Sequence, residues 1–282
     1  MTLKELKNHF VEELQASYTS SESERLFHIF LEELAGIRIG QFFLREMEKL
    51  EAEKLNELLE SLEKLKLGRP YQHILGYVPF ANLRLEVSPH VLIPRPETEE
   101  LAYLVKSKVE NTKGLKILDV GTGSGCLALS LSSFYTNAKV AAYDVSEEAL
   151  KLAEQNAKAN KLSVDFELVN FLDENSWTDE KWDIIVSNPP YIAEYEQDTM
   201  DGLVLNNEPW QALFVPDNDA LIFYQKIAEY SKTRLQEGGK LWVEINERLG
   251  AETLQVFTES GFKAELIQDM SGKDRFIEAW KD

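Results

Sequence analysis

The chain has 282 residues, enough for one large domain or for two, and 44% of them are hydrophobic, as in proteins with a buried core. Its formal net charge is −19 and its pI is near 4.7. A free nucleic-acid binder usually carries a basic face, so this balance argues against a broad DNA or RNA footprint, though not against a local basic patch.

Other features of the composition exclude further classes. The single cysteine, Cys126, excludes an internal disulfide and favours a reducing compartment. The start, MTLKELKNHF, lacks the apolar core of a signal peptide, and no run of about 18 apolar residues predicts a membrane span. The four histidines show no metal-ligand spacing. We therefore expect a cytoplasmic protein with no metal site.

The first part of the chain reads as a helical bundle. Ser21 and Glu24 have the spacing of a capping box, and a leucine- and phenylalanine-rich face follows them. A second leucine stripe runs from Leu55 to Leu65, and Gly68 is placed to end that helix. The charged stretch between these stripes indicates a solvated face with i,i+4 pairs. We expect a helical domain over 1–68.

A connector follows, with prolines and alternating apolar residues in GYVPFANLRLEVSPHVLIPRPETEEL. This pattern predicts a β-hairpin between about residues 75 and 93. Pro96 then stands near the start of a helix whose first turn is rich in glutamate. We assign the connector to 69–95 and a third region to 96–282.

From Lys116 onward, short β-branched runs alternate with helical patterns. The runs are KILDV, KVAAYDV, VDFELV, WDIIVS, KLWVEI, KAELI and RFIEAW. Helical patterns fall at 127–133, 147–160, 220–235 and 248–259. This alternation predicts an α/β fold with an open, mostly parallel seven-stranded sheet and helices on both faces. The short link DMSGKD predicts that the last two strands form an antiparallel hairpin at one edge.

A glycine loop ends the first of these strands, in LDVGTGSGCLAL. Gly121, Gly123 and Gly125 allow a sharp turn and close approach to a ligand, and the next helix offers free N–H groups. Asp144, at the tip of the second strand, is suited to accept two hydrogen bonds from a ribose. Such a loop also occurs in dinucleotide-binding proteins, and a tight turn without a ligand is a third interpretation.

Spacing and charge favour S-adenosylmethionine over a nicotinamide cofactor. The loop reads G-x-G-x-G, and Cys126 stands where a dinucleotide fingerprint has its last glycine or alanine. Asp119, two residues before the first glycine, would repel a pyrophosphate. A carboxylate there suits the ammonium of S-adenosylmethionine, which carries no phosphate.

A second motif follows the fourth strand, in DIIVSNPPYI. Asn188 lies at the carboxyl edge of the predicted sheet, where ligands of such folds bind. Pro189 and Pro190 are stiff, so the Pro189 carbonyl and the Asn188 side-chain oxygen form two fixed acceptors for a planar NH₂ group. Tyr191 can pack against the flat system that carries this nitrogen. Holding both hydrogens directs the weak lone pair at a methyl group, so Asn188 orients the nitrogen without deprotonating it.

These motifs together resemble a known family. The stretches HILGYVPF, LIPRPETEEL, ILDVGTGSGCLALSL, VSNPPYI, NEPWQAL and DRFIEA closely resemble the HemK-like (PrmC) release factor glutamine N5-methyltransferases, over nearly the whole chain. The resemblance implies a helical bundle, a β-hairpin connector and a Rossmann-like class I S-adenosylmethionine-dependent methyltransferase domain. It implies methyl transfer to the glutamine of the Gly-Gly-Gln motif of peptide-chain release factors, with the bundle and connector docking the factor.

The resemblance also assigns residues by position. It implies that the cofactor is bound by Asp119, Gly121, Thr122, Gly123, Ser124, Gly125, Asp144, Asn170, Phe171 and Asn188. It further implies that the glutamine is held by Asn188, Pro189, Pro190 and Tyr191, of which Asn188, Pro189 and Tyr191 would act in catalysis. The chain departs from the family where Asn170-Phe171 replaces a common Asp-Trp and where Asn246 replaces a common glycine. We expect altered cofactor affinity at the first place and a tolerated turn at the second.

Several alternatives stay open at this point. An N-methyltransferase acting on an exocyclic amine of adenine or guanine in nucleic acid also fits NPPY, and a non-enzymatic cofactor-binding module is a third class. Arg95 and Glu97 either line the cofactor site or form a helix-start ion pair, and Glu208 and Pro209 either shape the acceptor site or form a plain turn. Residues 193–206 are a candidate lid. We expect a monomer that binds release factors, no nucleic acid directly and no membrane.

Overall fold

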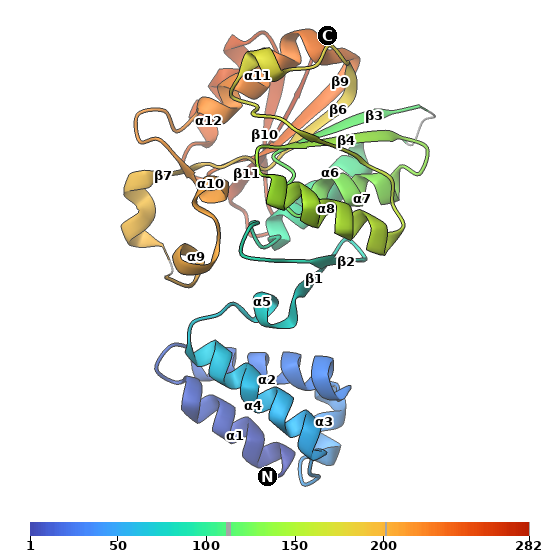
Figure 1. The fold of residues 1–282 in the computed structure, drawn as a ribbon. Helices are drawn as coiled ribbons and strands as arrows, with labels where there is room; N and C mark the ends of the chain where they lie inside the picture. The colour runs from blue at the N-terminus through green and yellow to red at the C-terminus, as the bar shows by residue number, and fades with distance from the viewer. Residues whose placement is uncertain (111–113, 201, 282) are drawn as a thin grey trace. The chain divides into compact units, whose positions relative to one another are not determined.

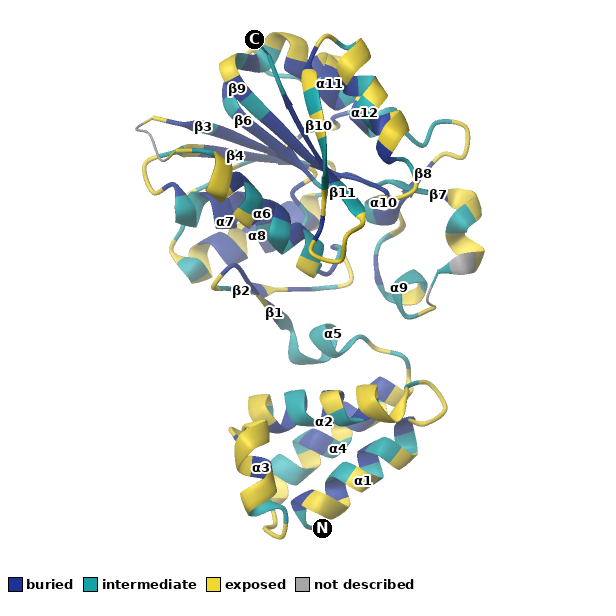
Figure 2. Cartoon of the chain, turned by 180° about the vertical axis from the view of Figure 1, so that it is seen from behind, coloured by how far each residue is buried: buried dark blue, intermediate teal, exposed yellow. Residues whose placement is uncertain are grey.

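The computed structural model describes residues 1–110, 114–200 and 202–281. Its internal contacts divide the chain into two compact units, Met1–Leu75 and Gly76–Asp282. Each unit has a core of its own, shown by the buried faces of its helices and strands in Figure 2. The two units are therefore described separately.

The first unit is a helical bundle, as predicted. Its helices are α1 (Leu3–Leu14), α2 (Ser20–Ala35), α3 (Ile39–Arg45), α4 (Ala52–Lys66) and α5 (Tyr71–Leu75). The predicted capping box at Ser21 and Glu24 is wrong, because Thr19 and Glu22 form the reciprocal pair that begins α2. Leu26, Phe27, Phe30 and Leu31 lie on the buried face of this helix, as the apolar pattern predicted. Gly68, with a φ of 75°, follows the end of α4 as expected.

The boundary between the units lies at Leu75 rather than at residue 68. Helix α5 packs on the core of the bundle through Tyr71, Ile74 and Leu75. The antiparallel hairpin of β1 (Tyr77–Phe80) and β2 (Leu83–Glu86) belongs to the second unit. The Asn156 amide of α8 (Glu147–Asn160) bonds both backbone polar groups of Glu86, at 2.6 and 3.0 Å, and so fixes the hairpin to that unit.

The second unit is built on a seven-stranded sheet, which confirms the predicted α/β class. Its strands are β3 (Lys116–Val120), β4 (Lys139–Asp144), β5 (Asp165–Leu168), β6 (Trp182–Ser187), β9 (Leu235–Glu244), β10 (Lys263–Gln268) and β11 (Asp274–Trp280). They lie in the order β10-β11-β9-β6-β3-β4-β5, and β11 alone runs against its neighbours. The predicted edge hairpin of β10 and β11 is confirmed.

Helices cover both faces of this sheet (Figure 1). Helices α6 (Pro96–Lys108) and α7 (Cys126–Phe134) pack on one face, and α11 (Ile222–Arg234) and α12 (Gly250–Glu259) pack on the other. Along β3, Leu118 and Val120 belong to the α11–α12 core, whereas Ile117 belongs to the α6–α7 core. Nearly every residue of the central strands is therefore buried.

The chain order creates the place for a site. From β3 the chain builds outward through β4 and β5, then returns to place β6 on the other side of β3. A ligand crevice opens at such a switch point, beyond the carboxyl ends of the strands. The segment after β6 adds short elements that were not predicted: β7 (Ile192–Ala193), η2 (Glu194–Thr199), α9 (Gly202–Asn207), α10 (Trp210–Leu213) and β8 (Phe214–Val215). Residue 201 of the candidate lid lies outside the described residues.

Candidate active site

A pocket of about 610 Å³ lies at this switch point, a volume ordinary for small-molecule sites. Its walls come from the loop after β3, the tips of β4 and β6, the segment before α6 and the segment from Pro209 to Phe223. Most predicted site residues line it: Asp119, Gly121, Thr122, Gly123, Ser124, Asp144, Asn170, Phe171, Asn188, Pro189 and Pro190. Gly125 and Tyr191 lie outside this lining.

The glycine loop separates two functions of glycine. Gly123 has a φ of 55°, and a Cβ added there would have no neighbour within 4 Å. Its N–H donates to Asp144 Oδ2 at 2.8 Å, so the loop is tied to the tip of β4. Gly125 has a φ of 84°, and a Cβ there would meet Leu129 at 3.1 Å and Ala153 at 3.2 Å. Gly125 thus permits α7 to pack on α8, whereas Gly123 faces the pocket.

Asp119 is a buried carboxyl with one unsatisfied oxygen. Its Oδ2 accepts hydrogen bonds from the Thr122 hydroxyl at 2.7 Å and the Ala128 N–H at 3.1 Å. Its Oδ1 has no hydrogen-bond partner among the described residues, although Asp119 is only 1% exposed. Burial raises the pKa of Asp119 to about 7 against the two hydrogen bonds, and the Asp144 charge adds to the rise. This acceptor fits a ligand ammonium.

Asp144 is held by backbone donors. Oδ2 accepts from Gly123, and Oδ1 accepts from the Ser146 N–H at 2.9 Å. Burial nevertheless leaves the pKa of Asp144 above its usual value. Each ionised carboxylate oxygen retains a further acceptor site, so the fixed group can take both hydroxyls of a ribose. Asp144 and Asp119 together give this side of the pocket hydrogen-bond acceptors and negative charge, which fit S-adenosylmethionine and would repel a pyrophosphate.

Asn170 and Phe171 occupy the predicted adenine end of the pocket. Asn170 is exposed, and its Oδ1 accepts from the Leu172 N–H at 3.2 Å. Phe171 is 5% exposed and packs against Trp177 and Tyr230, with ring centroids 5.6 and 5.1 Å away. The Trp177 indole N–H also donates to the Phe171 carbonyl at 2.9 Å. Most of the Phe171 surface is therefore buried in the core, although the residue also lines the pocket.

The residues after β6 point in two directions. Asn188, Pro189 and Pro190 line the pocket, and Asn188 Nδ2 donates to the Thr98 hydroxyl at 2.9 Å. Tyr191 instead packs against the core on the α11–α12 face, and its hydroxyl donates to Glu244 Oε1 at 3.2 Å. Burial raises the pKa of Tyr191 above its usual value. Tyr191 does not belong to the lining of the pocket, and the expected contact of its ring with substrate stays a prediction.

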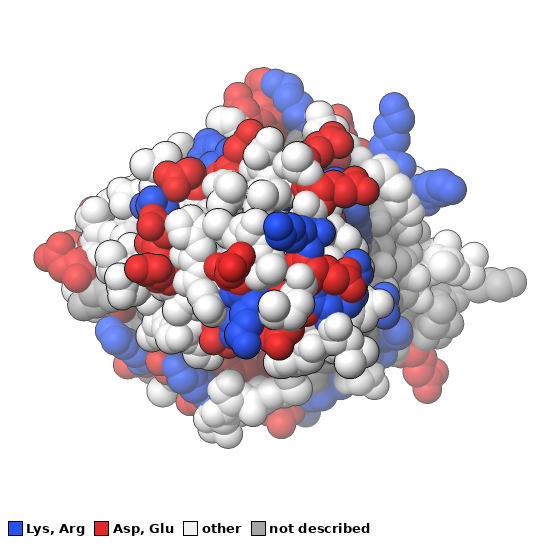
Figure 3. All heavy atoms as spheres, turned by 90° about the horizontal axis from the view of Figure 1, so that it is seen from below, with Lys and Arg blue, Asp and Glu red and all other residues white. Residues whose placement is uncertain are grey.

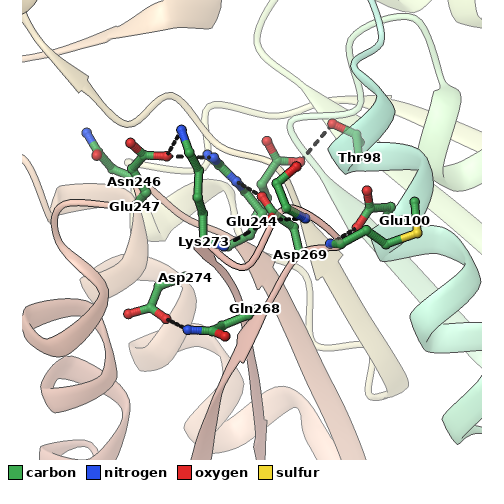
Figure 4. Close-up of polar contacts among 12 residues, drawn as sticks. Thr98, Glu100, Glu244, Asn246, Glu247, Gln268, Asp269, Lys273 and Asp274 are labelled. Atoms are coloured by element: carbon green, nitrogen blue, oxygen red, sulfur yellow. Dashed lines mark hydrogen bonds and ion pairs between the residues drawn. The ribbon is translucent and has the colours of Figure 1, made fainter.

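Thr98 and Glu244 were missed by the sequence analysis. Thr98, in the first turn of α6, donates its hydroxyl proton to Glu244 Oε2 at 2.7 Å, the contact drawn in Figure 4. Each residue is 1% exposed, and burial raises the pKa of Glu244 to about 7. Glu244 ends β9, the strand beside β6. The sequence signal that could have identified Glu244 is an acidic residue at the carboxyl end of a buried strand.

Arg95 and Glu208 form an ion pair that joins two walls of the pocket. Arg95 Nη2 lies 2.5 Å from Glu208 Oε1, and the other oxygen accepts from the Ile93 N–H at 3.0 Å. The Glu208 side chain is 1% exposed. This pair with a distant segment is neither of the two alternatives considered for Arg95, and neither Arg95 nor Glu97 belongs to the lining of the pocket. Pro209 and Trp210 follow directly on the pocket wall, so Glu208 also shapes the site.

The described residues give no support for a metal site or for a membrane-spanning helix. Within 1–110, 114–200 and 202–281, no group of three or more histidine, cysteine, aspartate or glutamate side chains is placed to hold a metal ion. In the same part of the chain, no helix has the length and apolarity needed to cross a membrane.

Family models match both units. The model for the methyltransferase small domain matches residues 101–269, and the PrmC N-terminal domain matches residues 5–76. A release factor glutamine methyltransferase of Flavobacterium psychrophilum is 41% identical and covers 98% of this chain and 98% of its own. A relative of the same name from Bacteroides thetaiotaomicron is 39% identical and covers 94% of this chain and 95% of its own.

Solved structures share the fold at lower identity. A methyltransferase from Pyrococcus furiosus has a TM-score of 0.52 at 20% identity and covers 82% of this chain and 99% of its own. The Thermus thermophilus 16S rRNA N2 G1207 methyltransferase, solved with AdoMet and guanosine, has a TM-score of 0.52 at 17% identity. It covers 73% of this chain and 50% of its own. These likenesses support the class I methyltransferase fold.

Proposed function

The chain belongs to the family of release factor glutamine methyltransferases, and from this premise we propose that it methylates the side-chain amide nitrogen of a release factor glutamine. The glutamine is the one in the Gly-Gly-Gln motif, and S-adenosylmethionine is the methyl donor. The observation that carries the proposal is one pocket that joins the acid-lined glycine loop to Asn188 and Pro189.

The reaction requires orientation more than a strong base. S-adenosylmethionine supplies an electrophilic methyl group on a sulfonium. The amide nitrogen forms a bond to that carbon, the carbon–sulfur bond breaks with its electron pair left on sulfur, and the nitrogen releases one proton. Asn188 Oδ1 and the Pro189 carbonyl accept the two N–H groups and direct the lone pair at the methyl. Positioning of this kind supplies roughly 7–11 kcal/mol of a barrier.

Other residues of the pocket have proposed roles in binding. Asp119 pairs with the ammonium of the methyl donor, and Asp144 accepts the ribose hydroxyls. Trp210 is 48% exposed and stacks on Phe214, with ring centroids 4.1 Å apart. Because it lines the pocket while remaining exposed, we assign it contact with the glycine main chain that precedes the glutamine.

The N-terminal unit is the proposed docking domain for the release factor. Exposed apolar side chains gather at α3 and just beyond it, where Phe43 is 68%, Leu44 87% and Met47 72% exposed. Such a patch on a small bundle is typical of a protein-interaction surface. We further propose that the protein acts as a monomer in the cytoplasm, where release factors are made and used.

Methylation of a nucleic-acid base is the competing function. On the face shown in Figure 3, basic and acidic side chains are interspersed, and a continuous basic surface is not seen among the residues coloured there. The net charge of −19 points the same way. Both observations favour a protein substrate.

Transfer of label from S-adenosylmethionine tests the proposal. Three acceptors are compared: a purified release factor, the same factor with the tripeptide glutamine changed to alanine, and total RNA with DNA. The proposal expects label on the first alone. Label on nucleic acid with none on the factor would reject it, and equal label on both factors would reject the glutamine as the site.

A further inference from the structure

We propose that Thr98 and Glu244 are positioning residues that hold the Asn188 amide with its carbonyl oxygen toward the substrate. The inference rests on the proposed function, since it explains how Asn188 presents an acceptor to an amide NH₂. Neither residue lies in the glycine loop or in NPPY. Each comes from a different element, α6 for Thr98 and β9 for Glu244.

The problem that these residues solve is the symmetry of an amide. The oxygen and nitrogen of the Asn188 side chain have nearly the same shape, so packing alone does not select between them. With Nδ2 toward the substrate, two donors would face each other and the NH₂ would not be held. Only the orientation with Oδ1 toward the pocket binds the amide.

A chain of hydrogen bonds makes this selection. An ionised Glu244 can only accept, so the single hydroxyl proton of Thr98 is used on Glu244 Oε2, at 2.7 Å. Toward Asn188, the Thr98 oxygen can then only accept. Asn188 therefore turns Nδ2 to Thr98, at 2.9 Å, and Oδ1 is the atom that remains for a ligand in the pocket.

Two hydroxyl donors favour the ionised, accepting form of Glu244. Its Oε1 accepts from the Tyr191 hydroxyl at 3.2 Å, so both carboxylate oxygens are bound by donors. The Tyr224 hydroxyl holds the backbone carbonyl of the same residue at 3.2 Å. This accounts for the placement of Tyr191 away from the pocket: Tyr191, directly after the two prolines, supports the acid that orders Asn188.

The arrangement also makes turnover depend on pH. A protonated Glu244 can donate to Thr98, whose own proton then turns toward Asn188 and favours the unproductive orientation. Burial and the Glu97 charge favour this protonated form, whereas the Arg275 charge and the two hydroxyl donors oppose it. The groups that interact with Glu244 are Glu97 and Thr98 of α6, Cys126 of α7, Tyr191 after β6, Tyr224 of α11 and Arg275 of β11.

The first experiment compares Thr98→Val, Thr98→Ser and Thr253→Val. Thr253 is a matched control, because it is fully buried and its hydroxyl donates only to the Leu249 carbonyl of its own helix end. We expect Thr98→Val to lower kcat, measured at saturating S-adenosylmethionine, about 10-fold or more. Its KM for S-adenosylmethionine, measured in a separate titration, should change less than about twofold. Thr98→Ser keeps the hydroxyl and should recover most of the loss. Thr98→Val with kcat within about twofold of the wild type would overturn the proposal.

The second experiment is independent of whether Thr98→Val folds. The wild-type kcat at saturating donor should fall as the pH drops below about 7, and Glu244→Gln should lose this acid limb. Asp119 titrates in the same range, but it acts on donor binding, so its effect on the measured rate is removed when the donor is saturating. An acid limb that persists in Glu244→Gln would overturn the proposal. A wild-type enzyme without glutamine methylation would instead reject the proposed function.

Discussion

Replacing Asp119 by asparagine should make the free protein more stable and its donor binding weaker. The substitution keeps the shape and the two hydrogen bonds to Oδ2 but removes the buried charge. The pKa of Asp119 rises from 3.8 to about 7, a shift of about three units, and each unit corresponds to about 1.4 kcal/mol. Burying the ionised group therefore costs at most about 4 kcal/mol above pH 7.

The expected gain in stability is smaller than this limit. The asparagine places an NH₂ group where Oδ1 has no hydrogen-bond partner, so we expect a rise of about 1–3 kcal/mol in the unfolding free energy at pH 8. Because the native pKa is raised, the native state binds the proton more tightly. The cost of Asp119 therefore appears as pH rises from about 4 to about 7 and is absent at lower pH.

Donor binding should change in the opposite direction. Loss of a charged hydrogen bond to the ammonium costs about 1.5–3 kcal/mol, which is roughly a 10- to 150-fold weaker affinity. Wild-type affinity should also fall as pH drops below about 7, and Asp119→Asn should lack that dependence.

Urea unfolding at pH 8 and pH 5, without the donor, and calorimetric titration with S-adenosylmethionine measure both effects. Asp183→Asn is a matched control. Asp183 lies near the start of β6, the strand beside β3, so it is at the edge of the sheet opposite to the pocket, and its carboxylate accepts a hydrogen bond from the Lys116 N–H. The reasoning is refuted by an Asp119→Asn variant that binds the donor as tightly as the wild type, or that is less stable than it at pH 8.

Four further substitutions test other parts of the site. Gly125→Ala should cost about 2–4 kcal/mol of stability, because its Cβ would crowd neighbouring side chains at a strained φ. Gly123→Ala should cost about 1–2 kcal/mol and mainly weaken donor binding, because its Cβ would have no neighbour. Urea unfolding measures the loss of stability in each variant, and calorimetric titration measures the loss of donor affinity. Trp210→Ala should raise KM for the release factor about 10-fold or more with donor affinity unchanged, and an unchanged KM would contradict its assignment. Glu208→Gln should loosen the pocket wall, seen as faster hydrogen exchange at the Ile93 N–H, and unchanged protection would contradict the ion-pair role.

Local signals account for the parts of the fold that the sequence predicted well. The β-branched runs and the glycine loop placed β3, β4 and β6 correctly, because period and turn chemistry are readable over a few residues. The start of α2 was wrong because the segment offers two overlapping capping pairs. The structure forms the pair at Thr19 and Glu22, and Ser23, the next residue of the helix, is buried.

The parts of the site that were missed depend on contacts distant in sequence. Thr98 and Glu244 meet across 146 residues, and Arg95 and Glu208 across 113, so neither pair has a local spacing. The direction of Tyr191 also could not be predicted, because it depends on the buried acid beneath it. Single residues at strand ends, such as Asp144 and Asn188, could be singled out from the sequence and line the pocket, but their partners required the folded chain.

The most direct test of the central claim is the single-turnover rate of methyl transfer in Asn188→Ala, measured together with the affinity for S-adenosylmethionine. The account holds that Asn188 orients the amide nitrogen. It expects the transfer rate to fall at least about 100-fold while donor affinity changes less than about threefold. A rate within about threefold of the wild type, or a loss explained entirely by weaker donor binding, would contradict it.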